Sequence, residues 1–236
     1  MKRSRETRVS VIIPTYQEGR YIDALLSKLK EMNYPLEIIV VDSGSADRTA
    51  EKARRYTDKV YVINQRGISK AKNYGANRSS GEILIFLDAD VTPPLELAEK
   101  TVRTFEDKRV VGATCSIMPA NARTSERAFF IFYNRLLRFC ALFKPHSRGE
   151  FLAVRRQPFF EIGGFDETLP CLEDHDLAFR ISKLGKFVFI SDLQVLESMR
   201  RMRKSGLHNV LKSWVANYLS YVLFGKTVSR TWSPVR

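Results

Sequence analysis

The first ninety residues alternate short apolar runs with segments whose apolar residues recur at helical spacing. The runs are rich in Val and Ile, and the last of them, at residues 83–87, is apolar throughout. Strands that are apolar on both faces are typical of parallel sheets covered by helices on both sides. The pattern therefore predicts an α/β fold around a mostly parallel sheet. Strands are expected at residues 9–13, 38–41, 60–63 and 83–87, with helices at 21–29, 50–56 and 69–77. Ser45 is the expected N-cap of the second helix.

The second half of the chain is less regular. Apolar runs predict strands at 110–118 and 151–154, and helical spacing predicts helices at 125–143, 173–184 and 207–224. The last helix carries a broad apolar face interrupted by Lys212 and Asn217, which predicts an amphipathic helix and not a membrane span.

Composition narrows the class of protein. With 236 residues, 44% of them hydrophobic, the chain is long enough for one α/β domain with a sizeable core. Cys115, Cys140 and Cys171 are scattered without a CxxC pair, which favours neither a disulfide framework nor a zinc site. The first apolar run is too short for a signal peptide. These features together predict a cytoplasmic location.

The net charge of +13 is concentrated in two segments. Residues 186–236 hold nine Lys/Arg against two Asp/Glu, and residues 123–156 hold eight against two. Such a balance indicates an anionic partner, either a phosphorylated substrate or an acidic membrane surface. The basic residues form no recognisable nucleic-acid reader motif, so no nucleic-acid partner is predicted. A solvated basic face is the remaining alternative.

Polar side chains follow three of the predicted strands. Thr15 and Glu18 come after the first strand, Asp42 and Ser43 after the second, and Asp88-Ala89-Asp90 after the fourth. Ligands of open parallel sheets lie beyond the carboxyl ends of the strands, so this edge is the expected ligand site.

The Asp88-Ala89-Asp90 turn predicts a metal site. Two carboxylates on one tight turn suit a hard cation such as Mg²⁺ or Mn²⁺, whose remaining ligands would be phosphate oxygens. Helix capping or ordinary turn chemistry is the alternative for such a short motif.

Two further segments carry candidate chemistry. Acidic residues open the predicted helix at 173–184, where a carboxylate could act as a general base or could simply complement the helix dipole. Gly163-Gly164 precedes it as a tight turn. The basic segment 66–75 resembles no phosphate-binding loop, and either an ordinary basic helix or a diphosphate contact would explain it.

Five motifs then occur in a fixed order: VSVIIPTYQEGRYI, IIVVDSGSADRTAEKA, GISKAKNYGANRSSGEILIFLDADV, EIGGFDETL and EDHDLAFRISKLGK. Each is weak alone, but the ordered set resembles the family 2 glycosyltransferases of GT-A fold over residues 8–190. The resemblance implies an inverting, metal-dependent transfer of a sugar from a nucleotide-diphosphate sugar, with UDP favoured over GDP, to an acceptor hydroxyl.

The resemblance also implies roles for individual residues. Asp174 matches the catalytic base, and Gly164 and Glu173 match the acceptor side. Asp90 matches the direct metal ligand, beside Asp88, with His208 as a candidate third ligand. The positions that match donor contacts are Pro14, Thr15, Glu18, Asp42, Ser43, Lys70, Asn73, Asp88, Ala89, Arg200 and Arg201.

The expected organisation follows from these assignments. Residues 1–113 form the donor-binding half, 114–197 the acceptor-binding and catalytic half of the same GT-A domain, and 198–236 a basic amphipathic extension. Residues 198–226 are expected to contact the inner face of the cell membrane peripherally. A lipid-linked acceptor or a cell-surface glycan precursor would suit that location. A core-packing helix or a homodimer interface is the alternative.

Two other functions stay open. A sugar nucleotidyltransferase shares a similar sheet and metal use, although its first turn is usually Gly-rich and basic, whereas here it reads PTYQEG. An inactive nucleotide-sugar-binding module is the other alternative, and the presence of Asp88, Asp90 and Asp174 argues against it.

Overall fold

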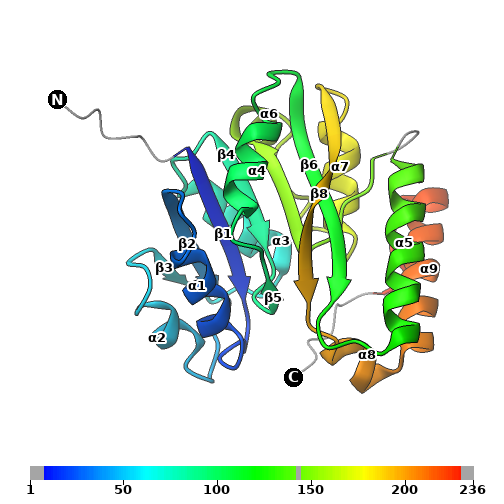
Figure 1. The fold of residues 1–236 in the computed structure, drawn as a ribbon, viewed down its shortest axis with the longest axis horizontal. Helices are drawn as coiled ribbons and strands as arrows, with labels where there is room; N and C mark the ends of the chain where they lie inside the picture. The colour runs from blue at the N-terminus through cyan, green and yellow to red at the C-terminus, as the bar shows by residue number, and fades with distance from the viewer. Residues whose placement is uncertain (1–7, 142–144, 230–236) are drawn as a thin grey trace.

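The described residues, 8–141 and 145–229 of a computed structural model, form one eight-stranded mixed sheet in the order β3-β2-β1-β4-β7-β6-β8-β5 (Figure 1). Neighbours are parallel from β3 to β4 and between β6 and β8, whereas β7 runs antiparallel to β4 and β6, and β5 runs antiparallel to β8. The strands are β1 (Val9–Thr15), β2 (Leu36–Asp42), β3 (Val60–Val62), β4 (Ile83–Leu87), β5 (Val91–Thr92), β6 (Val110–Pro119), β7 (Phe151–Arg155) and β8 (Lys186–Glu197).

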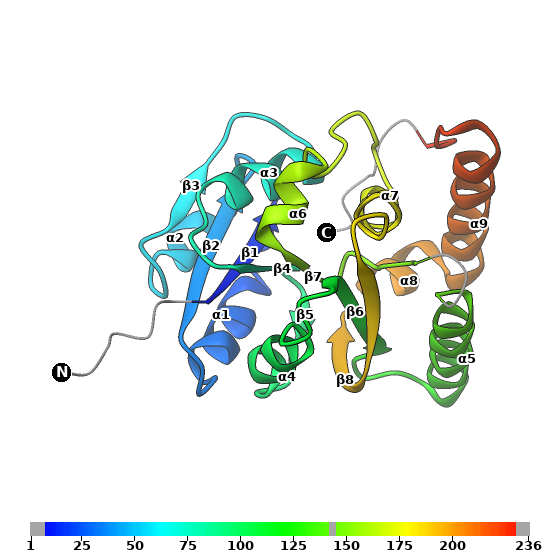
Figure 2. The same cartoon turned by 90° about the horizontal axis from the view of Figure 1, so that it is seen from above.

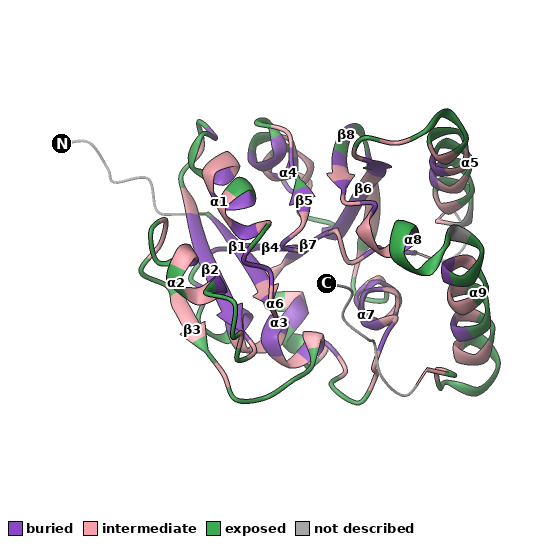
Figure 3. Ribbon diagram, turned by 90° about the horizontal axis from the view of Figure 1, so that it is seen from below, coloured by how far each residue is buried: buried purple, intermediate pink, exposed green. Residues whose placement is uncertain are grey.

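Helices cover both faces of the sheet, because alternate side chains of each central strand are apolar on both sides. One core joins Val11 to Leu26 and Leu97, and the other joins Ile12 to Leu177. The first face is covered by α1 (Ile22–Lys30) and α4 (Leu97–Thr104), and the second by α3 (Ile68–Asn77), α6 (Arg156–Glu161) and α7 (Glu173–Ile181). The short α2 (Thr49–Ala53) lies beside β2 and β3. Figure 3 shows the strands between these layers as largely buried.

Three more helices lie at the end of the molecule opposite α2 and β3 (Figure 2). They are α5 (Thr124–Cys140), α8 (Arg200–Ser205) and α9 (Leu207–Phe224). A small apolar cluster of Met118, Phe130, Met199, Met202 and Val210 joins their inner sides to the sheet. Within the described residues, no helix is long and apolar enough to cross a bilayer.

The predicted fold class is confirmed, and the predicted strands of the first half lie where expected. Three local differences have physical causes. The long strand β8 was not predicted, because its pairing with β6 jumps from Ile190 to Gln194 and the irregularity disrupts the two-residue period. The helix α4 was also not predicted, because one of its buried residues, Thr101, is polar and interrupts the apolar pattern of the helix. The predicted N-cap Ser45 is wrong: α2 begins at Thr49, and Ser45 contacts Asp42.

Two further predictions concern the end of one helix and the boundary between the two halves of the domain. The expected helix 125–143 ends at Cys140, and the part of it at 142–144 lies outside the described residues. The sheet continues across the expected boundary at 113, since β4 and β6 both pair with β7. The division into donor and acceptor halves therefore stays a prediction about function.

Candidate active site

The carboxyl ends of β1 and β2 meet as the apolar runs predicted. Thr15 and Asp42 are register partners, and the Thr15 hydroxyl donates to Asp42 Oδ1 at 2.9 Å. Ser45 donates to the same carboxylate from its backbone N–H at 2.8 Å and from its hydroxyl at 2.5 Å. The Ser43 N–H donates to the Thr15 carbonyl at 2.8 Å, and Pro14 lies half-buried just before. The buried Asp42 carboxylate is therefore fixed in one orientation.

The Asp88-Ala89-Asp90 turn leaves β4 and leads into β5. Ala89 is buried in the core, whereas both aspartates are half-buried. Burial raises the pKa of Asp88 to about 7, an effect that Lys72 opposes and Glu150 and Asp90 reinforce. Burial raises the pKa of Asp90 to about 6, although Arg200 opposes it. The turn thus concentrates negative charge where solvation is poor, as a cation site requires.

A guanidinium group joins the first turn of the chain to the Asp90 carboxylate. Arg200 pairs with both oxygens of Glu18, at 2.6 and 2.7 Å, and its Nε lies 2.9 Å from Asp90 Oδ2. Its Cζ atom also lies 4.7 Å from the centre of the Tyr21 ring. The structure therefore brings together two predicted donor contacts, Glu18 after β1 and Arg200 at the start of α8, with the predicted metal ligand Asp90 after β4.

The acids at the start of α7 are buried against a lysine from α3. Lys72 is fully buried, and its Nζ lies 3.0 Å from Glu173 Oε1 and 2.7 Å from Asp174 Oδ1. Burial opposes ionisation of Glu173, but Lys72 holds its pKa below the usual range. Burial and the charge of Glu173 raise the pKa of Asp174 well above its usual value despite Lys72. Asp174 is therefore the carboxylate of this pair that more readily takes up a proton.

Gly149 lies between the two predicted centres. A Cβ atom placed on it would be 2.9 Å from Asp174 Oδ2 and 3.4 Å from Asp88 Oδ2. The Asp174 oxygen that does not pair with Lys72 and the Asp88 carboxylate therefore both lie against Gly149, and a side chain at this position would press on them.

The turn at residues 162–167, called here the glycine turn, packs against α3. Asn73 donates from Nδ2 to the Phe165 carbonyl and to Glu167 Oε1, both at 2.9 Å, and accepts from the Phe165 N–H at 2.9 Å. Gly164 adopts φ +71°, and a Cβ there would be 2.7 Å from Asn73 Oδ1. The Asn73 amide therefore fixes the glycine turn, and its predicted contact with the donor stays a prediction.

A second buried ion cluster lies on the other side of the Asp88 turn. Arg148 is buried and pairs with Glu150 at 2.6 Å and Glu197 at 2.9 Å. Its CZ atom lies 5.4 Å from the ring centre of Tyr133 and 5.6 Å from that of Trp214. Aromatic faces and carboxylates together compensate the buried guanidinium.

The remaining predicted residues are Lys70, Arg201 and His208. Lys70 is half-buried on the first turn of α3, and Arg201 is half-buried on α8. His208 is exposed on α9 and lines a shallow groove there. Within the described residues, no three His, Cys, Asp or Glu side chains are grouped to hold a metal ion. His208 as a third ligand therefore stays a prediction that the geometry does not support.

The two aspartates nevertheless fit a hard cation. They provide oxygen ligands on one turn, and a cation such as Mg²⁺ or Mn²⁺ commonly takes its other ligands from waters and substrate phosphates. A cation that shares its ligands with a diphosphate needs no third protein group here.

Sequence reasoning missed Lys72, Gly149, Glu150 and Arg148. A signal existed for Lys72 alone, because Ser69, Lys72 and Ala76 follow helical spacing on one face of α3, and that face is buried. The contacts of Gly149 and Arg148 depend on segments far apart in the chain and have no local signature.

Replacing Lys72 with Met tests its role as counter-ion. The change leaves Glu173 and Asp174 buried without their cation, so we expect the free energy of unfolding at pH 7 to fall by about 3–5 kcal/mol. Urea denaturation measures it. Lys28→Met removes an exposed pair with Glu31 and serves as the control, with little expected change. An unchanged midpoint for Lys72→Met would contradict the assignment.

The sequence is similar to those of known glycosyltransferases. Glycosyltransferase AglE of Haloferax volcanii is 32% identical over 172 residues, which is 68% of this chain and 57% of AglE. The dolichol-phosphate mannosyltransferase of Pyrococcus furiosus is 34% identical over 139 residues, 55% of this chain and 38% of that protein. The chain therefore spans only part of the length of these relatives.

Solved structures show the same fold. Mannosyltransferase PcManGT from Pyrobaculum calidifontis, in complex with GDP-Man and Mn²⁺, superposes with a TM-score of 0.74 at 26% identity, covering 93% of this chain and 65% of that one. Staphylococcus aureus TarS in complex with UDP-GlcNAc gives 0.65 at 21% identity, over 81% of this chain and 58% of that one, which is evidence for the fold alone.

Two family models also match. The one described as Glycosyltransferase like family 2 matches residues 114–230, and the one described as Glycosyl transferase family 2 matches residues 10–163. The second match covers β1 to β7 and the Asp88-Ala89-Asp90 turn, which is more than half of the chain, and the protein therefore belongs to glycosyl transferase family 2.

Proposed function

We propose that the protein transfers a sugar, with inversion, from a nucleotide-diphosphate sugar to an acceptor hydroxyl. The observation that carries the proposal is the closeness of Asp174 and Asp88, whose carboxylates both lie against Gly149. A single in-line displacement needs a base for the acceptor close to the acid on the donor side, and these two carboxylates are proposed to fill those roles.

The chain's own residues account for each part of the reaction. Asp174 Oδ2 takes the proton of the acceptor hydroxyl as its oxygen bonds to the anomeric carbon. The bond from that carbon to the diphosphate oxygen breaks, and the nucleoside diphosphate leaves. A divalent cation held by Asp90 and Asp88 would neutralise the charge that builds on the diphosphate. Arg200 pairs with Glu18 and with Asp90, and its guanidinium is proposed to contact the diphosphate.

The donor is proposed to be a UDP-sugar, with a GDP-sugar as the second candidate. The related PcManGT was solved with GDP-Man, and TarS, which shares the fold, with UDP-GlcNAc, so the comparisons support this donor class without separating the two bases. The fixed Asp42 carboxylate beside Thr15 supports a contact with the nucleobase of the donor at the carboxyl ends of β1 and β2.

A thermal-shift screen tests donor and metal together. The protein is mixed with UDP-, GDP- and dTDP-sugars, with and without Mn²⁺. A ligand at about 100 times its Kd stabilises the folded state by about 2.7 kcal/mol, enough to detect. We expect the sugars of one nucleotide to raise the melting temperature, and this thermal shift should require Mn²⁺. We expect Asp90→Ala to lose that shift, because the direct metal ligand is gone, and Asp58→Ala, at an exposed acid, to keep it. A full shift in Asp90→Ala would contradict the metal site.

The variant Asp174→Asn tests whether Asp174 is the general base. The amide cannot take a proton, so we expect release of nucleoside diphosphate from the donor to fall by about 10²–10⁴-fold, whereas the donor-induced thermal shift is retained. The assay uses water as the acceptor and, in parallel, a polyprenyl phosphate. Unchanged turnover in this variant would remove Asp174 as the base.

The same assays separate the alternative functions. A sugar nucleotidyltransferase would release pyrophosphate from a nucleoside triphosphate and a sugar phosphate. An inactive binding module would show the thermal shift with no release of nucleoside diphosphate by the wild-type protein.

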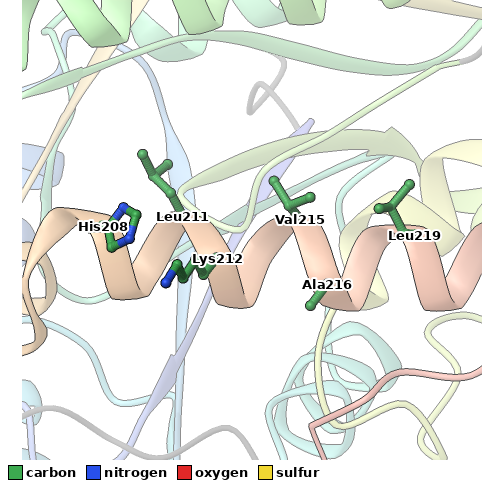
Figure 4. Close-up of a pocket in the computed structure, with 6 residues that line it drawn as sticks. All are labelled: His208, Leu211, Lys212, Val215, Ala216 and Leu219. Atoms are coloured by element: carbon green, nitrogen blue, oxygen red, sulfur yellow. The ribbon is translucent and has the colours of Figure 1, made fainter.

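A peripheral membrane contact is the second part of the proposal. The outer sides of α5 and α9 expose large apolar side chains, among them Phe132 at 64%, Leu223 at 69% and Phe224 at 74%. Figure 4 shows Leu211, Val215 and Leu219 pointing to one side of α9 along the shallow groove. This outer surface of α5 and α9 is here called the apolar face.

Charge favours an anionic bilayer as the partner. Arg135, Arg138, Lys212 and Lys226 are exposed on or beside the apolar face, and α9 contains no Asp or Glu. Fewer residues within 198–226 are proposed to contact the membrane, because Arg200 pairs with Glu18 inside the protein and Met199 and Met202 are buried. A contact of this kind suits a lipid-linked acceptor.

Vesicle flotation tests the apolar face. We expect the protein to float at low salt with phosphatidylcholine vesicles that contain phosphatidylglycerol, and less with phosphatidylcholine alone, because each surface Lys or Arg contributes about 1 kcal/mol to binding an anionic leaflet. The triple variant Phe132→Ser, Leu223→Ser, Phe224→Ser should lose flotation. The control, Leu95→Ser with Leu184→Ser, changes apolar residues exposed elsewhere. Absence of flotation, or a dimer in light scattering that the triple variant abolishes, would contradict the membrane contact.

A further inference from the structure

The inner side of α9 is attached to the catalytic half through aromatic residues. Trp214, Tyr218 and Tyr221 follow one another at i, i+4 and i+7, which places them on one face of the helix. Trp214 stacks near Arg148, and the Tyr218 hydroxyl lies 2.6 Å from His146 Nε2. Each contact reaches a polar group close to the site and not a purely apolar core.

The third contact reaches the helix that carries the proposed base. The Tyr221 hydroxyl donates to Asp176 Oδ1 at 2.8 Å. The other oxygen of Asp176 pairs with Arg180, at 2.7 Å from Nε and 2.6 Å from Nη2. Both oxygens of the Asp176 carboxylate are thus engaged, one by α9 and one by a neighbour on α7, so its plane is fixed.

Arg180 in turn holds the glycine turn. Its Nη1 donates to the Ile162 carbonyl at 3.0 Å, and its Nη2 donates to the Gly164 carbonyl at 2.8 Å. One guanidinium therefore joins α7 to both ends of the Ile162–Gly164 segment. The geometry forms a continuous chain of hydrogen bonds from Tyr221 through Asp176 and Arg180 to the turn.

The glycine turn depends on such support from outside. Gly163 and Gly164 both adopt positive φ, +78° and +71°, and neither has a side chain with which to anchor the segment. Asn73 holds the turn from α3 on one side, and Arg180 holds it from α7 on the other. Two backbone hydrogen bonds also hold the turn, from the Gly163 N–H to the Phe160 carbonyl at 3.0 Å and from the Gly164 N–H to the Phe159 carbonyl at 2.9 Å. Loss of the Asn73 or Arg180 contacts would weaken this anchoring and give the glycine backbone more freedom.

We infer that Tyr221 is a positioning residue for the glycine turn, acting through Asp176 and Arg180. The inference rests on the proposed function in one respect, because the role of this turn in binding the acceptor is itself proposed. It assigns to the C-terminal helix a part in shaping the acceptor side of the site, separate from any partner on the apolar face.

Hydrogen–deuterium exchange measured by mass spectrometry tests the inference without knowledge of the acceptor. Tyr221→Phe removes only the hydroxyl that donates to Asp176. We expect peptides covering residues 160–168 to exchange about tenfold faster than in the wild type, because losing a hydrogen bond to a charged group lowers local stability. Peptides from β1 should be unchanged. Tyr34→Phe removes a hydroxyl from a half-buried tyrosine packed on the other core and should leave residues 160–168 as in the wild type.

A double-mutant cycle separates positioning from general stabilisation of α9. Asp176→Asn should also speed exchange of the glycine turn, and adding Tyr221→Phe to it should have little further effect, because both changes break the same chain. Additive effects, or faster exchange confined to α9, would overturn the inference.

The inference and the proposed function fail in different ways. Unchanged exchange at residues 160–168 in Tyr221→Phe overturns the inference, whatever the enzyme does. Absence of any nucleotide-sugar shift in the wild type would overturn the proposed function and leave the exchange result standing.

Discussion

A single buried ammonium group joins the two halves of the site. Lys72 extends from α3 to the carboxylates that open α7, and its charge also acts on Asp88 beyond β4. An unpaired charge in such a place would cost several kcal/mol, so α3, α7 and the end of β4 have to keep their relative positions for the cluster to be stable. The close approach of α3 to the sheet is possible because Gly75 faces Ile12, where a Cβ would come within 2.5 Å. The position of Asp174 therefore depends on packing far from its own helix.

The site as a whole alternates acids with a few buried cations. Glu18 and Asp90 share Arg200, Glu173 and Asp174 share Lys72, and Glu150 and Glu197 share Arg148. Each cation is held by two carboxylates, and burial raises the pKa of one of them in each cluster: that of Asp90 to about 6, and those of Asp174 and Glu197 well above their usual values. Burial also raises the pKa of Asp88 to about 7. A bound divalent cation would favour the ionised forms of Asp88 and Asp90. A divalent cation with a diphosphate would enter a region that already contains the opposite charges needed to hold both.

The sequence predicted those parts of the site that depend on strand ends. Continuous apolar runs located β1, β2 and β4, so the sequence alone assigned Thr15, Asp42 and Asp88 to the edge of the sheet formed by the carboxyl ends of these strands. The sequence alone did not identify Lys72 as a buried counter-ion, since that requires knowing which face of α3 meets the sheet. The donor contact of Lys70 stays a prediction. The sequence could not find Gly149 or Arg148, because their contacts join segments distant in the chain. The strand β8 was not predicted because its pairing with β6 is irregular after Ile190, which breaks the two-residue alternation of its side chains.

The C-terminal helix has an unusual distribution of polarity. Its outer side exposes Leu219, Leu223 and Phe224, whereas its inner side combines the apolar Val210 with Trp214, which lies near the buried Arg148, and with Tyr218 and Tyr221, whose hydroxyls contact His146 and Asp176. A helix that only completed a core would expose fewer large apolar side chains and make fewer polar contacts on its buried side. Because those contacts fix the rotation of α9 about its axis, they also fix the direction of the apolar face. A surface that binds this face would therefore be held at a set distance and angle from the glycine turn, which is what a membrane-bound acceptor would require.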